Sequence, residues 1–435
     1  MHTGTPVLPV HIGARNSARF YGVSTLAKPL ATAMLPREAV AWRDRSIRMR
    51  VGTLINAEEI RRRSKGDSHQ AARLMRRHVY RLARGHEPIF SGQTPLAQAE
   101  PANAVGAELQ QRGELLAEVG KGHQIWLFPG TADGVVMREL GRLRELTFRK
   151  VGEGTGLSCD LDAYDAWYEH LILWDNGSRC IVGAYRLGHA GRILEQRGLR
   201  GLYSASLFDF TPKLSAQLAT GLGLDRSFIT PVYWHSHALS YLWHGIGLYL
   251  LQHKQIRYLF GPVSLSVNLP LEAREWIVAA HQHYFSAPGL ASAHRPFRVS
   301  TTTLDCVRAA LNGLDPIAGL KYLRHHLDAL GVTYPVLYRK YVDLVEPEGV
   351  RFLDFGEDPM FSGCVDGMLV LDLAYVKPAK RARYQKPLGA GASPTGTGYT
   401  EATCRSEWPS ARETICSPSP QQNRCPIPRS NSPAN

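Results

Sequence analysis

Two apolar segments on either side of a tight-turn sequence constrain the fold more than any other feature. The segments are HLILW at 170–174 and CIVGAYRL at 180–187, and Asp175-Asn176-Gly177 begins the connection between them. Asn-Gly supplies the positive φ angles that short hairpin turns need, so the two segments are expected to pair as antiparallel strands. The chain is therefore expected to contain a sheet with a β-hairpin in it.

Helical and extended patterns around this hairpin extend the prediction. An amphipathic helix is expected over 136–151, where Val136, Leu140 and Leu143 form one apolar stripe. Further helices are expected at about 58–83, 105–119, 212–221, 236–253, 270–285 and 315–329, and further strands at 124–128, 201–207, 226–230 and 258–260. This order predicts an α+β fold with a mostly antiparallel central sheet flanked by helices.

The composition changes along the 435 residues, which are too many for one core. Residues 5–55 contain the runs VLPVHI and IRMRVG between turn residues, a pattern typical of strands joined by loops. After Lys380 the sequence is rich in Ser, Pro, Gly and Thr, lacks periodic apolar residues, and is expected to be disordered. The expected divisions are 1–57, 58–104, 105–380 and 381–435.

Positive charge is concentrated near the N-terminus. The chain has 51 Lys and Arg against 38 Asp and Glu, and residues 1–90 contain 17 of the basic and 6 of the acidic side chains. Such a segment suits nucleic acid or an anionic membrane surface, although an exposed, solvated helix has the same composition. No apolar run reaches the roughly 18 residues that span a bilayer, and residues 1–13 lack the pattern of a signal peptide. We therefore expect a cytoplasmic protein that meets membranes only peripherally.

Cysteines and histidines do not indicate a metal site or a disulfide framework. The seven cysteines form no C-x-x-C pair and are odd in number, which fits a reducing cytosol. His235, His237, His244 and His253 have no acidic or cysteine partners at ligand spacing. No metal ligand is predicted.

Three alternating glycines in FRKVGEGTG, at 148–156, have the density of a phosphate-binding loop. Such loops follow a strand and open a helix, whose first amides face the anion. These glycines instead follow the helix expected at 136–151, where glycine provides a left-handed C-terminal cap. We expect them to end that helix and to act as a hinge, without binding a nucleotide.

Three aspartates follow the glycines within six residues. Asp160 and Asp162 share a face if the chain is extended there, which creates an anionic pocket for an ammonium group. Alternatively, Asp162 or Asp165 caps a helix ahead of AWYEH. The local sequence leaves both interpretations open.

The order of several motifs is similar to that of a known family. The chain resembles the acyltransferase domain of ornithine-lipid synthases, called hemolysin-like, in VMRELGRLRELTFRKVGEGTG, DLDAYDAWYEHLILWD, IVGAYRL, GLYSASLFDF, LGLDRSFITPVYW, YLWHGIGLYL and YLFGPVSLS. That domain is a branch of the GCN5-related N-acyltransferase (GNAT) superfamily and is similar to the acyl-homoserine-lactone synthases. The resemblance spans about residues 115–375. It implies transfer of a 3-hydroxyacyl chain from acyl carrier protein to the α-amine of ornithine, giving lyso-ornithine lipid at the inner membrane.

Cofactor and partners follow from the same resemblance. Members of the superfamily that use coenzyme A have a glycine-rich pyrophosphate loop after a central strand, whereas this chain has FITPVYWHSHALSYLWHG there. The implied donor is therefore acyl carrier protein, which presents the acyl chain on its phosphopantetheine arm, and no other cofactor is implied. Ornithine, acyl carrier protein and an anionic membrane surface are the expected partners, and nucleic acid is not.

Residues 5–55 resemble the last third of a glycerolipid O-acyltransferase domain, in VLPVHIGARNSARFYG and TAMLPREA. That domain uses an H-x-x-x-x-D motif, and the one such spacing in this chain joins His170 to Asp175. Positions five apart on a strand point to opposite faces, so the two side chains are not expected to act together. Residues 1–57 are therefore expected to be a C-terminal fragment of such a domain, followed by a basic helical linker at 58–104 and the N-acyltransferase domain at 105–380.

Nine residues form the predicted site. The resemblance assigns Arg144 and Arg226 to the donor and to the acceptor carboxylate, and the aspartates to the cationic acceptor and to bracing of the arginines. A purely structural Arg–Asp network is the alternative. The predicted substrate-binding residues are Arg144, Phe148, Asp160, Asp162, Asp165 and Arg186, and the predicted catalytic residues are Asp225, Arg226 and Ser227.

One departure from the family pattern affects the expected activity. The family has Glu, Leu, Gly, Arg, Ser where this chain has Gly223, Leu224, Asp225, Arg226 and Ser227. Because residues two apart share a strand face, Asp225 is expected to replace the missing carboxylate in part. Two other functions stay open: a catalytically impaired, membrane-binding remnant, and nucleic-acid binding through 37–84, which lacks a groove-reading motif.

Overall fold

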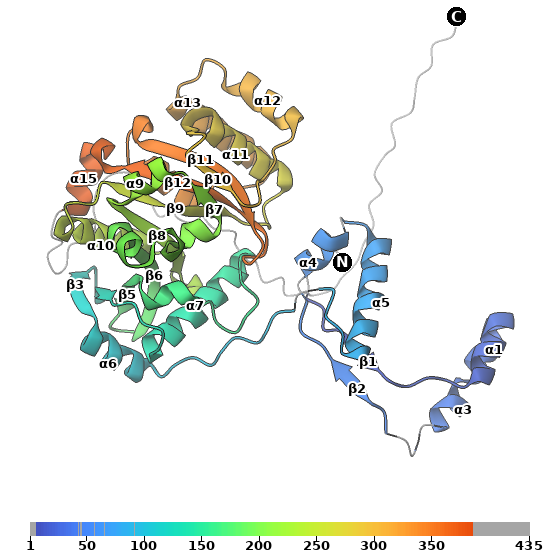
Figure 1. The fold of residues 1–435 in the computed structure, drawn as a ribbon. Helices are drawn as coiled ribbons and strands as arrows, with labels where there is room; N and C mark the ends of the chain where they lie inside the picture. The colour runs from blue at the N-terminus through green and yellow to red at the C-terminus, as the bar shows by residue number, and fades with distance from the viewer. Residues whose placement is uncertain are drawn as a thin grey trace, which may run out of the picture.

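An eight-stranded sheet forms the centre of the protein (Figure 1). The computed structural model describes residues 6–385 except Trp42, Asp44, Arg45, Asn56, Lys65 and Ser91. The strand order is β11-β12-β9-β8-β6-β5-β4-β3, and every neighbouring pair is antiparallel except β8 with β9. The strands are β3 (Glu114–Val119), β4 (His123–Phe128), β5 (Glu169–Asp175), β6 (Cys180–His189), β8 (Gly221–Ile229), β9 (Tyr258–Leu265), β11 (Val350–Asp358) and β12 (Cys364–Asp372). The α+β prediction is confirmed.

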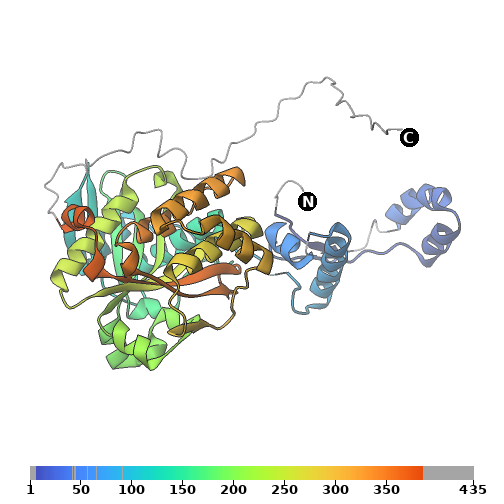
Figure 2. The same ribbon diagram turned by 90° about the horizontal axis from the view of Figure 1, so that it is seen from above.

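Helices cover both faces of this sheet (Figure 2). One face packs against α10 (Ala238–Gln252), α11 (Leu271–Phe285), α12 (Thr301–Leu311), α13 (Pro316–Ala329) and α14 (Val336–Val342). The other face packs against α6 (Ala102–Arg112), α7 (Val135–Val151), α8 (Ala190–Arg197) and α9 (Pro212–Leu218). The apolar stripe predicted on α7 is buried in the second of these layers.

The β5–β6 hairpin forms where the sequence predicts it. Asp175 Oδ1 accepts the backbone N–H of Gly177 at 2.9 Å and of Ser178 at 3.1 Å, which closes the turn. The paired strands then run from Asp175 and Cys180 to Glu169 and Leu187.

The parallel strands β8 and β9 separate soon after they begin. They pair only over Gly221↔Tyr258, Leu222↔Leu259 and Gly223↔Phe260. Beyond that point β8 pairs with β6 alone and β9 pairs with β12 alone. The two strands therefore diverge in the middle of the sheet and leave facing backbone edges without a partner strand.

A bulge in β8 places two successive side chains on one face. Arg226 has a φ of 47°, in the left-handed region, and the register to β6 shifts beside it. Asp225 and Arg226 consequently both face α7, whereas Leu224 packs in the core beneath α10. A regular strand would have directed them to opposite faces.

Several predicted elements are wrong, and nearby backbone geometry explains the difference. The helix expected at 105–119 stops at Arg112, and Glu114–Val119 becomes β3 because it pairs with β4 at the sheet edge. The strand expected at 201–207 is two single 3-10 turns, Leu199–Gly201 and Tyr203–Ser206. Short strands follow and pair instead, β7 (Phe208–Phe210) with β10 (Ala291–Ala293).

The N-terminal region mixes the expected strands with unexpected helices. β1 (Val10–Ile12) and β2 (Met49–Val51) lie in the predicted runs and pair with each other. Between them are α1 (Ala18–Leu26), α2 (Lys28–Ala33) and α3 (Leu35–Val40), which begin at a Ser17 cap or with proline in the first turn. The predicted basic helix is divided into α4 (Ala57–Ser64) and α5 (Ser68–Arg84).

At the other end, α15 (Pro378–Gln385) packs on α10 and continues past the predicted boundary at 380. The disorder predicted beyond it falls on residues 386–435, outside the described part. Nowhere in the described ranges does a helix have the length and apolar character needed to cross a bilayer.

Close packing at the point where β8 and β9 separate gives a stability prediction. A Cβ on Gly261 would lie 2.2 Å from the carbonyl oxygen of Leu224, which is backbone and cannot turn away. Gly261→Ala is expected to lower the free energy of unfolding by about 1–3 kcal/mol in urea denaturation. Gly223→Ala, whose nearest neighbour would lie at 3.4 Å, is the matched control and is expected to change stability little. Equal stability of the two variants would contradict the packing argument.

Candidate active site

The glycine-rich segment ends α7 in a Schellman motif, as the sequence predicts. Gly152 adopts a φ of 82° and donates its N–H to the Arg149 carbonyl, and Glu153 donates its N–H to the Phe148 carbonyl. The loop then turns back over the helix that it ends.

The loop amides bind an anion that belongs to the protein itself. Glu145 is fully buried and accepts the N–H of Thr155 at 3.0 Å, the Thr155 hydroxyl at 2.7 Å and the N–H of Gly156 at 2.8 Å. Arg149 Nε donates to the same carboxylate at 2.7 Å. The donors that make such a loop look like a phosphate cradle are therefore already used by Glu145.

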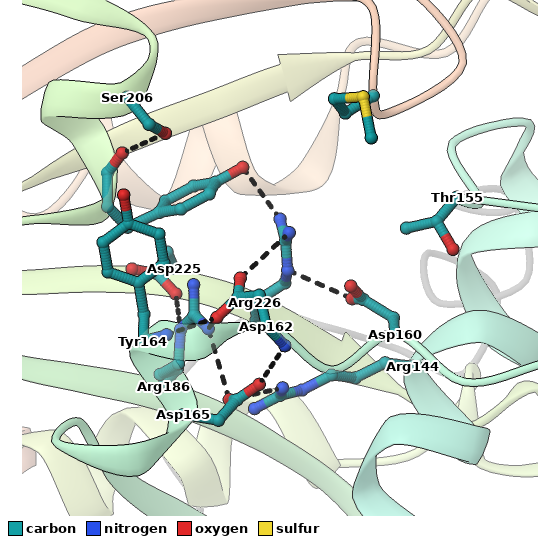
Figure 3. Close-up of polar contacts among 12 residues, drawn as sticks. Arg144, Thr155, Asp160, Asp162, Tyr164, Asp165, Arg186, Ser206, Asp225 and Arg226 are labelled. Atoms are coloured by element: carbon teal, nitrogen blue, oxygen red, sulfur yellow. Dashed lines mark hydrogen bonds and ion pairs between the residues drawn. The ribbon is translucent and has the colours of Figure 1, made fainter. Parts of the chain in front are cut away.

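Two buried arginines hold the aspartate segment that follows (Figure 3). Arg144 of α7 donates to Asp165 at 2.8 Å. Arg186 of β6 donates to Asp162 and to Asp225, each at 2.5 Å, and reaches Asp165 at 3.2 Å. Both arginine side chains have no exposed surface.

The aspartates cap a short helix, which is one of the two interpretations that the sequence left open. Asp162 accepts the N–H of Tyr164 and Asp165 accepts the N–H of Asp162, which forms a capping box on the 3-10 turn Ala163–Ala166. Their remaining oxygens face the arginines. Helix capping and arginine binding are thus achieved by the same two carboxyl groups.

Arg226 occupies the centre of the site. Its Nε lies 3.1 Å from Asp160 Oδ2, its Nη2 lies 3.4 Å from Asp162 Oδ2, and its Nη1 donates to the Tyr203 hydroxyl at 2.9 Å. The contact with Asp160 lacks hydrogen-bond alignment, so Arg226 Nε and Asp160 Oδ2 have no hydrogen-bond partner among the described residues. Asp160 and Asp162 both face the guanidinium group of Arg226.

Aromatic rings surround these guanidinium groups. Arg186 lies 5.1–5.7 Å from the ring centres of Tyr164, Tyr168 and Tyr203. Arg226 lies 4.7 Å from the ring of Tyr203 and 4.9 Å from that of Phe361. Such faces stabilise a desolvated cation and exclude water from it.

Two predicted residues, Phe148 and Ser227, lie outside the network of charged side chains around Arg226. Phe148 packs edge-on against Phe361 at 4.8 Å and so supports the ring beneath Arg226. Ser227 follows the bulge and lies near the hydroxyl of Tyr185, a residue of the core beneath α10. The structure thus brings eight of the nine predicted residues together and turns Ser227 to the opposite face.

His170 and Asp175, the two residues with H-x-x-x-x-D spacing, are not in contact with each other, as expected. His170 Nδ1 faces Arg144 at 3.2 Å, and burial, reinforced by the charge of Arg144, lowers the pKa of His170 to about 3. Asp175 lies at the other end of β5 and accepts the hydroxyl of Tyr233. His170 is therefore a neutral structural residue that orients Arg144.

Three further buried carboxyl groups extend the site, and the sequence analysis missed them. Glu153 lies in the glycine loop, Asp358 at the end of β11 and Asp366 in β12. Ser264 of β9 donates to Glu153 at 3.0 Å, and Tyr203 donates to Asp358 at 3.5 Å while it accepts from Arg226. Only the position of Glu153 between two glycines hinted at this role from the sequence.

Several carboxyl groups of the site have raised pKa values, because they are buried and the nearby cations do not fully offset that burial. Burial raises the pKa of Glu153 to about 7, although the hydrogen bond from Ser264 opposes this rise. Burial and then the charges of Asp358 and Glu153 hold the pKa of Asp366 well above its usual range. Burial also raises the pKa of Asp160 and of Asp225, against the arginines beside them.

The site therefore has more carboxyl groups than guanidinium groups. Its three arginines are Arg144, Arg186 and Arg226, and its carboxyl groups are Asp160, Asp162, Asp165, Asp225, Glu153, Asp358 and Asp366. Such an imbalance favours binding of a cationic group. No group of three or more His, Cys, Asp or Glu that could hold a metal ion occurs in the described part of the chain.

Comparison with known proteins agrees with this architecture. The acetyltransferase (GNAT) domain family matches residues 143–244. A glycine N(alpha)-acyltransferase of Bacteroides thetaiotaomicron is 30% identical over 257 residues, covering 55% of this chain and 74% of that protein. Another, from Phocaeicola vulgatus, is 30% identical over 179 residues, covering 38% of this chain and 55% of that protein. The chain belongs to the GNAT superfamily of N-acyltransferases, and its reaction is acyl transfer to an amine.

Two solved structures of the CoA-dependent acyl-homoserine lactone synthase BjaI are also similar in part. The one with MTA has a TM-score of 0.24 at 15% identity and covers 45% of this chain and 92% of its own. The one with SAM and isopentyl-CoA has a TM-score of 0.23 at 13% identity, with coverages of 43% and 89%.

The ion pairs of Asp165 predict a pH-dependent contribution to stability. Burial acts to raise the pKa of Asp165, but the charges of Arg144 and Arg186 outweigh it and hold that pKa well below its usual range. Asp165→Asn is expected to lower the free energy of unfolding by about 3–5 kcal/mol at pH 7, because it leaves buried charge unpaired. A depressed pKa stabilises the fold above the unfolded value near 4, so the difference should shrink as the pH falls below about 4.

Urea denaturation across this pH range measures the difference. Asp209→Asn, which alters an exposed aspartate, is the control and should change stability by less than about 0.5 kcal/mol. A loss that is small at pH 7, or that grows on acidification, would contradict the role assigned to Asp165.

Proposed function

We propose that the protein transfers a 3-hydroxyacyl chain from acyl carrier protein to the α-amine of ornithine, forming lyso-ornithine lipid. Acyl transfer to an amine is the chemistry of its superfamily, and the sequence motifs resemble the ornithine-specific branch. The observation that carries the choice of acceptor is the excess of carboxyl groups around Arg226. An acceptor with two ammonium groups and one carboxylate matches that balance, since it offers two cations to the acids and one anion to an arginine.

The diverging strands β8 and β9 offer a place for the donor. Beyond Gly223 and Phe260 their facing edges have no partner strand in the described part of the chain, and we expect backbone amides there to bind the amide groups of a phosphopantetheine arm. Arg226, which binds Asp160 and Asp162, lies on this stretch of β8. The thioester and the amine would thus meet at the bulge in β8.

The connection from β8 to α10 supports a carrier-protein donor. It runs from Thr230 to His237 through one 3-10 turn, Pro231–Tyr233, and contains no glycine. No side chain caps the first turn of α10 either. A pyrophosphate loop of the usual glycine-rich kind is therefore missing from this connection, and the basic helices α4 and α5 offer complementary charge to an acidic carrier protein or to an anionic membrane.

Glycine is the second candidate acceptor, because two similar proteins are named glycine N(alpha)-acyltransferases. Glycine has one ammonium group and leaves more of the buried carboxyl groups without a cation. Ornithine has a second ammonium group that glycine lacks. A direct comparison of the two amines as substrates therefore distinguishes the two candidates.

Steady-state assays of the purified protein test the proposal. With 3-hydroxyacyl carrier protein as donor, kcat/KM for ornithine is expected to exceed that for glycine by about 10- to 100-fold, the worth of one charge-assisted hydrogen bond. Mass spectrometry of the lipid product identifies the acylated amine. Norvaline, which has the carbon chain of ornithine without its second amine, is the matched control and should behave like glycine.

Acyl-CoA in place of acyl carrier protein tests the donor, and at least tenfold lower kcat/KM is expected with it. A preference for glycine would contradict ornithine as the acceptor and would support glycine instead. Binding to anionic vesicles without acylation of any amine would instead support the membrane-binding remnant and defeat the enzymatic proposal.

A further inference from the structure

We infer that Glu153 is the catalytic base that removes a proton from the ammonium group of the acceptor. The inference rests on the proposed transfer of an acyl chain to an amine, and it holds for any amine acceptor. It assigns a chemical role to the centre of the glycine loop, which the sequence alone describes only as a hinge.

The backbone of Glu153 is fixed on both sides. Its own N–H closes the Schellman motif on Phe148, and the following carbonyl, of Gly154, accepts the hydroxyl of Ser362 at 2.7 Å. Gly154 itself packs so closely that a Cβ there would lie 2.6 Å from Cγ of Arg149. A side chain that starts from so constrained a backbone is held in place without help from a substrate.

The carboxyl group of Glu153 has one bound and one free oxygen. Oε2 accepts the Ser264 hydroxyl at 3.0 Å, whereas Oε1 has no hydrogen-bond partner among the described residues. Glu153 as a whole is 8% exposed. No arginine or lysine in the described part forms an ion pair with this carboxyl group.

Ser264 places this carboxyl group where the donor would enter. It lies on β9 beyond Phe260, in the part of the strand that has separated from β8. Arg226 lies across that separation on β8, where it binds Asp160 and Asp162 of the segment that follows α7. An amine held by the acidic side of the site would approach the thioester between these two walls.

The groups that face Glu153 leave it able to exchange a proton near neutral pH. They are Asp366 and Cys364 of β12, Tyr338 of α14 and Ser264 of β9. None of them is a cation, and burial raises the pKa of Glu153 to about 7, which suits a general base at physiological pH.

Other carboxyl groups of the site are less suited to this role. Asp165 is held ionised by Arg144 and Arg186 and is a weak base. Asp225 accepts a hydrogen bond from Arg186 Nε at 2.5 Å and is paired with that cation. Burial, followed by the charges of Asp358 and Glu153, holds the pKa of Asp366 well above its usual range.

The proton and bond changes balance in this scheme. The acceptor ammonium gives one proton to Glu153 Oε1, and the free amine attacks the thioester carbonyl, so that a C–N bond forms as the C–S bond breaks. A second proton passes from the new amide nitrogen to the departing thiolate, which leaves as the thiol of the phosphopantetheine arm. Glu153 returns its proton to solvent. No oxidant, metal or further reactant is required.

Glu153→Gln tests the inference, because glutamine keeps the acceptor for Ser264 and cannot take up the proton. We expect kcat to fall by about 100-fold or more with KM for the amine changed less than about threefold. In the wild type kcat/KM should rise with pH through a pKa near 7, and this limb should vanish in the variant. Glu357→Gln, a change at an exposed glutamate of β11, is the matched control and should leave both unchanged.

Ser264→Ala provides an independent test. If Glu153 had only a structural role, this variant would not change the pH dependence of activity. The Ser264 hydrogen bond lowers the pKa of Glu153, so its loss should shift the pH limb to higher pH while activity at the alkaline plateau is kept. This arm also decides the matter if the glutamine variant does not fold.

Unchanged kcat in folded Glu153→Gln, or an unshifted limb in Ser264→Ala, would overturn the assignment to Glu153 while the acyl transfer proposed above stands. A wild type that acylates no amine would instead remove the proposed function, and the base with it.

Discussion

The structure depends on the burial of Arg186. This guanidinium group has no exposed surface, and a charge in that environment is stable only with opposite charges and hydrogen bonds around it. Asp162, Asp165 and Asp225 supply them from two segments that are far apart along the chain. The segment after α7 must therefore lie against β6, and β8 must bulge so that Asp225 and Arg226 turn to the same face.

The end of α7 is the second fixed point of the site. Its glycines form a helix cap, and the loop then wraps around the buried carboxylate of Glu145, which accepts the amides of Thr155 and Gly156. This arrangement holds the loop against the helix and orients Glu153 toward β9. The same few residues thus connect the helix that carries Arg144 to β9.

Charge balance links this architecture to function. The three arginines organise the acids, but they do not neutralise them, and the surplus carboxyl groups have raised pKa values because they are buried. A GNAT enzyme of this kind gains much of its rate from positioning, since no covalent enzyme intermediate is needed. The proposed roles of the site, binding an ammonium group and removing its proton, both depend on these surplus carboxyl groups.

Local patterns determined much of this protein in advance. The β5–β6 hairpin, the stripe and the glycine cap of α7, the helix cap at Asp162 and the separation of His170 from Asp175 all follow from the spacing of neighbouring residues. The set of charged residues around Arg226 also came from sequence, through the order of motifs.

Long-range pairing decided the rest. Glu114–Val119 became a strand because an edge of the sheet was available to it, Ser227 left the site because the bulge reversed its direction, and Glu153 met Ser264 and Asp366 only after β9 and β12 had paired. Sequence spacing gives the direction of a side chain from its own strand or helix. The groups that a side chain contacts depend on segments that can be more than 100 residues away, as Ser264 is from Glu153. Those contacts form only when the strands of the sheet have paired.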